Sequence, residues 1–413
     1  MLSWNLTPMS SMLCERAWVE IDLGALAYNV QQIRKLLSPT TELMAVVKAD
    51  AYGHGSVTVA QTVLQHGATR LAVATIAEGI ELRQAGIEAP ILLLGATNTP
   101  EQVRAIAYWQ LQPTICTPKQ ALVVSETLAA MDRNRVLPVH LKIDTGMSRL
   151  GIPWQQAAQL GQLVERLPHV QIASVYSHLA TADSPNPTIM RLQHTRYKEA
   201  IASLKSVGIN LPCLHFANSA ATLVDSALHY DLVRVGLAIY GLHPAAHLRA
   251  TIDLKPVLQV KARVTQVKTI EAGTGVSYGH QYMADQEMLL AVVGIGYADG
   301  IPRNMSNRMT VLIRGQRIPQ IGVITMDQLM VDATTIPNLQ EGEVVTLLGQ
   351  DGQNYISAED WAMSLGTISW EILCGFKHRL PRVSVSQLPI THTTSDASFQ
   401  SKSSNNIVTS QSG

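Results

Sequence analysis

Several short runs in this sequence combine a cation, a hydroxyl group and glycines directly after an apolar stretch. In "AVVKADAYGHG", Lys48 closes an apolar run, and Tyr52, Gly53 and Gly55 follow it. A lysine that is taken out of water can act as a neutral amine and form a Schiff base with an aldehyde. Glycine lets the backbone approach a bound molecule closely, and a tyrosine hydroxyl can bind an anion. This run therefore indicates a site for an aldehyde.

Two later runs indicate a phosphate site. The run "ANSAAT" offers the Ser219 hydroxyl and the amides of a helix start, and "RVGLAIYG" offers backbone amides around Gly236. Such amides bind phosphate because they carry partial positive charge. An aldehyde and a phosphate on one ligand suggest pyridoxal 5′-phosphate.

The alternation of apolar runs predicts the elements that position these residues. Between residues 43 and 237, eight β-rich runs alternate with helical patterns, as in βαβ units around a parallel sheet. The runs begin at residues 43, 71, 90, 111, 138, 170, 213 and 231. This count predicts an α/β fold with a (β/α)8 barrel of the TIM type. An open doubly wound sheet is the competing fold, but no GxGxxG run follows the first strand.

In a barrel of this type, chemistry takes place at the carboxyl ends of the strands. Each unusual side chain taken alone is more often a solvated or structural residue, but here they converge on one rim. The residues at these strand ends are Lys48 (first), Lys142, Asp144 and Arg149 (fifth), His178 (sixth), Asn218 and Ser219 (seventh), and Arg234 and Gly236 (eighth).

After Pro256 the pattern changes to alternating β-branched and polar residues with Gly and Pro breaks, which predicts a mostly β second domain. We expect a loose extension over 1–15, the barrel over 16–255 with 16–24 pairing with the second domain, a β-rich domain over 256–384, and a disordered polar tail over 385–413. In "SAEDWAMSLG", Ser357 and Asp360 predict a helix with a capping box.

Composition excludes some classes of function. The chain has 413 residues, 46% hydrophobic and 15% charged, with a formal net charge of zero. This balance gives no electrostatic attraction to nucleic acid or an anionic membrane. The longest apolar run has 11 residues, too few to span a bilayer. Four scattered cysteines without a CxxC pair favour a reducing compartment and indicate no metal site.

Over about residues 16 to 384, the sequence resembles the alanine racemases, pyridoxal-phosphate enzymes with a barrel and a β domain. The resemblance rests on eight motifs in family order: "AVVKADAYGHG", "KIDTGMSRLG", "SHLATAD", "HFANSAAT", "RVGLAIYG", "GVSYGHQYMA", "GYADGIPR" and "TMDQLMVD". It implies a homodimer with a shared active site that interconverts L-alanine and D-alanine, supplying D-alanine for peptidoglycan in a bacterial cytoplasm.

The resemblance implies two bases. Lys48 would carry the cofactor as a Schiff base and act as one base, and Tyr278 would reach in from the partner subunit as the other. Racemisation needs a base on each face of a planar carbon. A chain from Tyr278 through His178 to Arg234 would assist the phenol, and Arg234 would face the ring nitrogen and leave it unprotonated.

The remaining implied roles concern cofactor and substrate binding. Arg149 and the Met326 amide would hold the substrate carboxylate, and Lys142 lies at a position that is carbamylated in many relatives. The phosphate group would contact Tyr52, Ser219, Gly236 and Leu237, and Asn218 would also lie at the cofactor. Tyr297, Met326 and Asp327 would line the entrance from the partner subunit, which selects a small side chain by steric exclusion.

Two positions depart from the family pattern, and other functions stay open. Trp370 stands in "TISWEILC" where relatives have a tyrosine near the phosphate, and Val323 stands where relatives often have an arginine. A racemase of broader specificity is one alternative, and a decarboxylase or a non-catalytic pyridoxal-phosphate carrier are two more. A decarboxylase is disfavoured because an arginine for the carboxylate opposes its release, and a carrier is disfavoured because it would lack the second domain.

Overall fold

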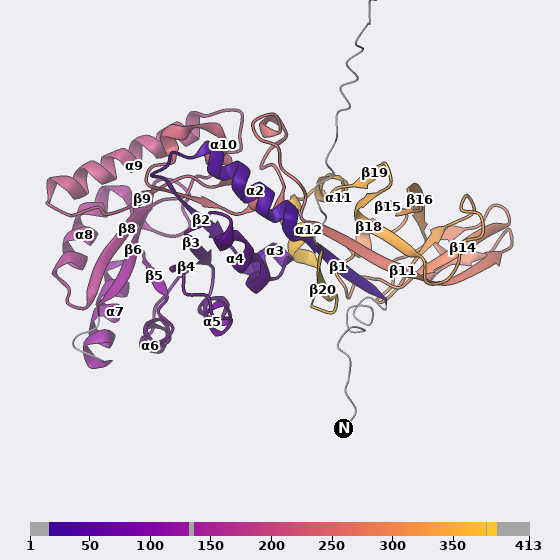
Figure 1. Ribbon diagram of the computed structural model, residues 1–413, viewed down its shortest axis with the longest axis horizontal. Coiled ribbons are helices and arrows are strands. Elements are labelled where there is room, and N and C mark those ends of the chain that lie inside the picture. Colours follow the sequence, from indigo (N-terminus) through magenta and orange to yellow (C-terminus); the bar gives the residue numbers. More distant parts are fainter. Residues whose placement is uncertain (1–15, 132–135, 377, 386–413) are drawn as a thin grey trace, which may run out of the picture.

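The computed structural model describes residues 16–131, 136–376 and 378–385 (Figure 1). The predicted N-terminal extension and residues 386–413 of the predicted tail lie outside these residues. The elements form two nine-stranded sheets, one in each half of the molecule, and a two-stranded hairpin.

The first sheet closes into a barrel. Its neighbours follow the order β5-β4-β3-β2-β10-β9-β8-β6, and β5 also pairs with β6. All pairings among these eight strands are parallel, so the predicted (β/α)8 barrel is confirmed. The strands are β2 (Glu42–Val46), β3 (Arg70–Val73), β4 (Ile91–Ala96), β5 (Gln112–Ile115), β6 (Leu137–Asp144), β8 (Val170–Tyr176), β9 (Leu214–His215) and β10 (Leu232–Val235), and the short β7 (Ile152–Pro153) pairs with β6.

Helices cover the outside of the barrel, so its strands are buried on both faces and are largely apolar. Side chains define where several helices begin: Thr75 and Glu78 form a capping box on α5, and Thr99 and Gln102 form one on α6. The helices are α2 (Leu23–Leu36), α3 (Lys48–Gly53), α4 (Ser56–Gln65), α5 (Ile76–Gln84), α6 (Pro100–Tyr108), α7 (Pro118–Met131), α8 (Ala157–Arg166), α9 (Thr188–Ser206) and α10 (Ser219–Val224).

The second sheet is antiparallel apart from one pair, and its order is β19-β18-β15-β16-β17-β14-β11-β1-β20. The predicted capping box of Ser357 and Asp360 is present. The strands of this sheet are β1 (Ala17–Asp22), β11 (Leu258–Ile270), β14 (Met288–Val293), β15 (Thr310–Ile313), β16 (Gln316–Ile321), β17 (Leu329–Asp332), β18 (Val344–Asp351), β19 (Asn354–Ile356) and β20 (Arg382–Val385). The helices of this half are α11 (Ala358–Leu365) and α12 (Ser369–Gly375), and the hairpin is β12 (Gly275–Val276) with β13 (Tyr282–Met283).

The N-terminal strand ties the two halves together. β1 pairs with β11 and β20 of the second sheet, and then leads directly into α2 of the barrel through the N-cap Asp22. Asn29 on α2 donates to the carbonyls of Ile239 and Lys255, and one cluster of buried apolar side chains runs through both halves. α12 packs against α3 at the rim of the barrel, where the Leu373 carbonyl faces Gly53. The exact boundary after residue 255 stays a prediction. None of the described helices has the length and apolarity to cross a membrane.

Candidate active site

A cavity of about 640 Å³ opens at the carboxyl ends of the barrel strands. Trp370 and Cys374 of α12 close part of it. The cavity brings together the ten barrel residues that the sequence assigned to the site: Lys48, Tyr52, Lys142, Arg149, His178, Asn218, Ser219, Arg234, Gly236 and Leu237. Asp144 is not among the lining residues, because its Oδ1 accepts from the amides of residues 146, 147 and 148 and so shapes the loop before Arg149.

Lys48 lies at the start of an unusual backbone turn. The strand β2 ends at Val46, not at the lysine as the sequence indicated, and the four residues from Ala49 to Tyr52 have φ of 51° to 55°. A left-handed conformation costs a non-glycine residue roughly 1–2 kcal/mol. The Glu78 carboxylate accepts from the Ala49 amide at 2.8 Å, and the Asp50 carboxylate accepts from the Ser56 amide at 2.7 Å. These bonds stabilise the turn that directs Lys48 and Tyr52 into one cavity.

Arg234, on β10, is a buried cation held by neutral acceptors. It donates from Nη1 to His215 Nδ1 at 2.9 Å, and from Nη2 to the Ser177 carbonyl at 2.7 Å and the Phe216 carbonyl at 3.2 Å. His178 Nδ1 lies 3.4 Å from Nη2. Burial and the nearby Arg234 charge hold the pKa of His178 well below its usual range, so its ring is neutral.

Lys142, on β6, faces the same cavity without a carboxylate partner in the described part of the chain. Its Nζ lies 5.2 Å from the centre of the Tyr176 ring, and Arg234 Cζ lies 5.1 Å from the same ring. Burial, together with the charge of Arg234, lowers the pKa of Lys142 to about 8. A substantial fraction of this amine is therefore neutral near pH 7.5.

The predicted phosphate residues form a cradle of neutral groups. A Cβ at Gly236 would lie 2.6 Å from Tyr52 Oη, so only glycine leaves room for that hydroxyl. The Gly236 amide donates to Ser219 Oγ at 3.1 Å, and Asn218 caps α10 by accepting from the Ala221 amide. These hydroxyls and amides lie at the start of α10 and at the start of a short 3-10 helix that begins at Leu237. Such groups suit a phosphate, so these residues fit the phosphate end of pyridoxal phosphate.

The four residues predicted to act across a dimer do not line this cavity. They gather at one end of the second sheet, where the Tyr297 amide donates to the Thr325 carbonyl at 3.0 Å and Asp327 accepts from Arg379 at 2.7 Å. Their side chains are solvent-exposed, with Tyr278 at 72%, Met326 at 53% and Tyr297 at 39%. One chain therefore holds the predicted site in two separate parts.

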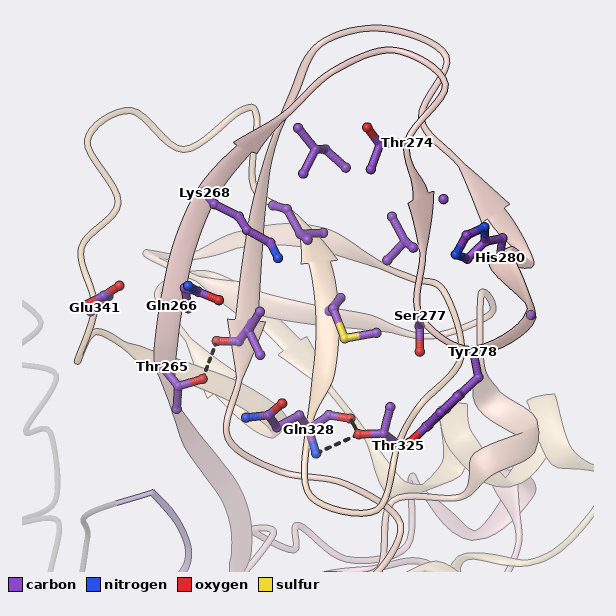
Figure 2. Close-up of a pocket in the computed structure, with 17 residues that line it drawn as sticks. Thr265, Gln266, Lys268, Thr274, Ser277, Tyr278, His280, Thr325, Gln328 and Glu341 are labelled. Carbon is purple, nitrogen blue, oxygen red and sulfur yellow. Dashed lines mark hydrogen bonds between the residues drawn. The ribbon is translucent and has the colours of Figure 1, made fainter.

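The backbone directs Tyr278 outward from its hairpin. Ser277, Gly279 and His280 all have positive φ, and Ser277 Oγ donates to the Val323 carbonyl at 2.7 Å. In Figure 2 the Tyr278 side chain extends from this loop toward Thr325, and both residues line a second cavity of about 820 Å³ in this region. Val323, one departure from the family pattern, is buried and anchors the loop through its carbonyl.

Sequence reasoning missed three polar residues inside the barrel. His140, Ser174 and His215 are buried on β6, β8 and β9, next to Arg234 or linked to it through hydrogen bonds. His140 stands two positions before Lys142, and Ser174 stands two positions before Tyr176. Lys142 and Tyr176 both line the cavity. Because side chains alternate across a strand, this spacing was the available signal that they point into the barrel.

Comparison with known proteins places the chain in a family. Two family models match, "Alanine racemase, N-terminal domain" over residues 21–244 and "Alanine racemase, C-terminal domain" over residues 257–384. The chain belongs to the alanine racemase family. It is 70% identical to the alanine racemase of Nostoc sp., covering 90% of this chain and 96% of that protein. It is 62% identical to that of Synechocystis sp., covering 90% of this chain and all of the relative.

Solved alanine racemases share the architecture. The crystal structure of the enzyme from Bacillus anthracis with bound L-Ala-P has a TM-score of 0.84 and 36% identity, and covers 90% of this chain and 95% of that one. The enzyme from Streptomyces coelicolor has a TM-score of 0.84 and 35% identity, covering 92% of this chain and all of that one. Alanine racemases are isomerases that use pyridoxal phosphate, which agrees with the cofactor predicted from the sequence.

Proposed function

We propose that this chain interconverts L-alanine and D-alanine with pyridoxal phosphate, as a homodimer in which Tyr278 of the partner subunit completes each cavity. One observation carries the proposal: ten predicted residues line one cavity, whereas Tyr278 is exposed on the other half of the molecule. Met283, on the hairpin that carries Tyr278, is also exposed. Tyr297 and Met326 are exposed next to Thr325, which lines the same cavity as Tyr278. A group of exposed apolar residues is typical of a surface that another protein covers.

Lys48, Arg234 and the phosphate cradle would hold the cofactor. The Lys48 amine would bind its aldehyde, the Arg234 guanidinium would donate to its ring nitrogen, and Tyr52, Ser219, Gly236 and Leu237 would contact its phosphate, with Asn218 fixing the start of α10. When bound, pyridoxal phosphate supplies a conjugated ring that accepts the electron pair left by removal of the α-proton. The protein then needs only to hold the substrate and move protons.

Two bases would move the α-proton. Lys48 Nζ would take or return it on one face of the α-carbon, and Tyr278 Oη of the partner subunit would do so on the other. Each enantiomer uses the two groups in the reverse order. The exposed Tyr278 side chain, with its loop anchored by Ser277, is suited to enter a cavity on a second subunit.

His178 would assist the phenol as a hydrogen-bond donor. Arginine has no acceptor atom, so the contact with Arg234 requires an unprotonated Nδ1 on His178. The neutral ring then carries its proton on Nε2, and this N–H would donate to Tyr278 Oη of the partner subunit. Such a donor stabilises the charge on the oxygen when the phenol gives up its proton.

Arg149 and Lys142 would fix the substrate. The Arg149 guanidinium suits a carboxylate, and the Met326 amide of the partner subunit would add a second donor. Lys142 is buried with a lowered pKa, so its neutral amine would add carbon dioxide and release a proton, which gives a carbamate anion that pairs with Arg149. Tyr297, Met326 and Asp327 of the partner subunit would narrow the entrance to admit a methyl side chain. The product would supply peptidoglycan synthesis in the cytoplasm.

Mixed dimers test the shared site directly. The chains Lys48→Ala and Tyr278→Ala, carrying different affinity tags, are co-expressed, and the doubly tagged dimers are purified. Each mixed dimer would hold one intact site and one doubly damaged site, so it should have about half the wild-type activity, whereas both parent homodimers should be nearly inactive. Inactive mixed dimers would contradict a site shared between subunits.

Substrate choice is tested on the wild-type dimer. Racemisation of L-alanine, L-serine and L-lysine is followed by circular dichroism, with Lys48→Ala as the control. Alanine should be converted fastest, and faster conversion of serine or lysine would replace the proposal with a racemase of broader specificity.

A further inference from the structure

Arg234 is the first member of a chain of buried hydrogen bonds that leads away from the cavity. Its Nη1 lies 2.9 Å from His215 Nδ1, and His215 Nε2 lies 2.7 Å from Ser174 Oγ. Ser174 Oγ lies 2.6 Å from His140 Nδ1, and His140 Nε2 lies 2.9 Å from Gln112 Oε1. The first four side chains are almost fully buried, so water does not interrupt the chain.

Chemistry sets the direction of every bond in this chain. Arg234 can only donate, so His215 Nδ1 accepts, and the neutral ring carries its proton on Nε2 and donates to Ser174. At the far end, the Gln112 carbonyl oxygen can only accept, so His140 donates from Nε2 and accepts at Nδ1. The Ser174 hydroxyl therefore accepts from His215 and donates to His140. The four hydrogen bonds of the chain can therefore run in one direction only.

Burial holds both rings in the form that this direction requires. Burial lowers the pKa of His140 to about 3, and burial and the Arg234 charge hold the pKa of His215 well below its usual range. A second proton on His215 would place a donor opposite Arg234, and one on His140 would remove the acceptor of the Ser174 hydroxyl. Both histidines therefore stay uncharged, and the hydrogen bonds of the chain keep one fixed direction.

Barrel register places the members of the chain side by side. They come from the successive neighbours β10, β9, β8, β6 and β5. An irregularity between β6 and β8 shifts the pairing, so that Val139 pairs with Ile172 but the next residue, His140, pairs with Ser174. Without this irregularity, Ala173 would stand opposite His140, and the hydroxyl that links the two histidines would be displaced.

The chain also determines which donors Arg234 has left. A guanidinium has five N–H groups, and within the described residues its contacts use both on Nη2 and one on Nη1. The Nε–H and one Nη1–H remain, and Arg234 lines the cavity. Since His215 receives the neighbouring Nη1–H, a rotation of that ring would turn the guanidinium plane.

We infer that Ser174 and His140 are positioning residues for the racemase reaction, which fix the neutral His215 tautomer and through it the direction in which Arg234 donates to the cofactor. This inference rests on the proposed function. It predicts that substitutions at these buried residues, which do not contact the substrate, lower kcat more than they change KM.

The first experiment reads the tautomer and needs no turnover. Nitrogen-15 NMR of histidine-labelled dimer should show His140 and His215 both with a protonated Nε2 and an unprotonated Nδ1. In Ser174→Ala the Nε2–H of His215 loses its acceptor and His140 loses its donor, so both signals should shift. An unchanged His215 signal in this variant, or a protonated Nδ1 in the wild type, would overturn the inference, even if the enzyme racemises alanine.

The second experiment separates positioning from stability. Ser174→Ala should lower kcat by about tenfold with little change in KM, and should shift the visible absorbance of the bound cofactor. Ser174→Thr, which keeps the oxygen, should restore both values. The matched control is Ser125→Ala on α7, whose hydroxyl donates to the Pro168 carbonyl and takes no part in the chain from Arg234. This variant should lower Tm but leave kcat and absorbance unchanged.

Two results separate this inference from the proposed function. A wild-type dimer without alanine racemisation would reject the proposed function and leave the NMR test in place. Wild-type racemisation, with Ser174→Ala differing from wild type no more than Ser125→Ala does, would reject the positioning role alone.

Discussion

The barrel rim and the Tyr278 end of the second sheet hold their functional side chains in opposite ways. At the rim, Arg234 and Lys142 are buried, and hydrogen bonds or ring contacts hold the arginine on several sides. At the other end, backbone geometry orders the loop, while Tyr278 is 72% exposed. The first group is therefore preorganised inside one chain, whereas the side chains of the second group face solvent in that chain.

Removal of the Lys48 amine at the barrel rim should cause the largest loss of activity. Lys48→Ala removes the amine that would bind the cofactor and move the proton, so the rate of D-alanine formation should fall by about 10⁴-fold. The control is Lys119→Ala, an exposed lysine at the start of α7, which should keep full activity. Activity in Lys48→Ala within tenfold of the wild type would assign the base to another amine.

Removal of the Tyr278 hydroxyl, at the end of the second sheet, should cause the next largest loss of activity. Tyr278→Phe keeps the ring but removes the hydroxyl, and it should lower racemisation by about 10²-fold to 10³-fold. Exchange of the α-proton with deuterium, measured by NMR, should be lost from one enantiomer and largely retained for the other. Tyr108→Phe, at a tyrosine that is 73% exposed on the barrel, is the control. Equal, mild losses for both enantiomers would reject the base role.

Acid should destabilise the barrel because its buried histidines are neutral. Burial lowers the pKa of His54 to about 4 and that of His140 to about 3. The unfolded chain takes up these protons below about pH 6.5 and the folded barrel does not, so the free energy of unfolding falls as the pH falls. At pH 5, each histidine should lower the free energy of unfolding by about 2 kcal/mol. Urea unfolding between pH 5 and 8 tests this, and equal values at pH 5 and 7 would contradict it.

A smaller effect tests the exposed edge of the cavity. Arg149→Lys keeps the charge but loses the two-pronged geometry that suits a carboxylate, so KM for alanine should rise by about tenfold. The control is Arg166→Lys at the end of α8, an exposed position outside the cavity. An unchanged KM would show that another group binds the substrate carboxylate.

The smallest effect tests the fit of the phosphate cradle. Gly236→Ala adds a Cβ that would meet Tyr52 Oη at 2.6 Å, so the affinity for pyridoxal phosphate should fall about fivefold. Tyr52→Phe removes that oxygen, so the double variant should lose less than the sum of the two single variants. Strictly additive losses would indicate that the cofactor does not depend on this contact.

The sequence alone determined the fold class and one side of the site. Eight apolar runs at regular intervals are enough to predict a barrel, and the carboxyl ends of parallel strands must then meet at one rim. Lys48, His178 and Arg234 could be assigned to that rim because each stands at such an end. The capping box at Ser357 was equally predictable because it depends on residues only three positions apart.

Tertiary structure decided what depends on register and on distance in space. The left-handed turn after Lys48 requires Glu78 from another unit, and the contact between His140 and Ser174 requires an irregular pairing of two strands. No local pattern encodes either, because both join segments that are far apart in the chain. For the same reason, only the folded chain could show that Tyr278 lies outside its own cavity, since a motif specifies a side chain but not the surface that it meets.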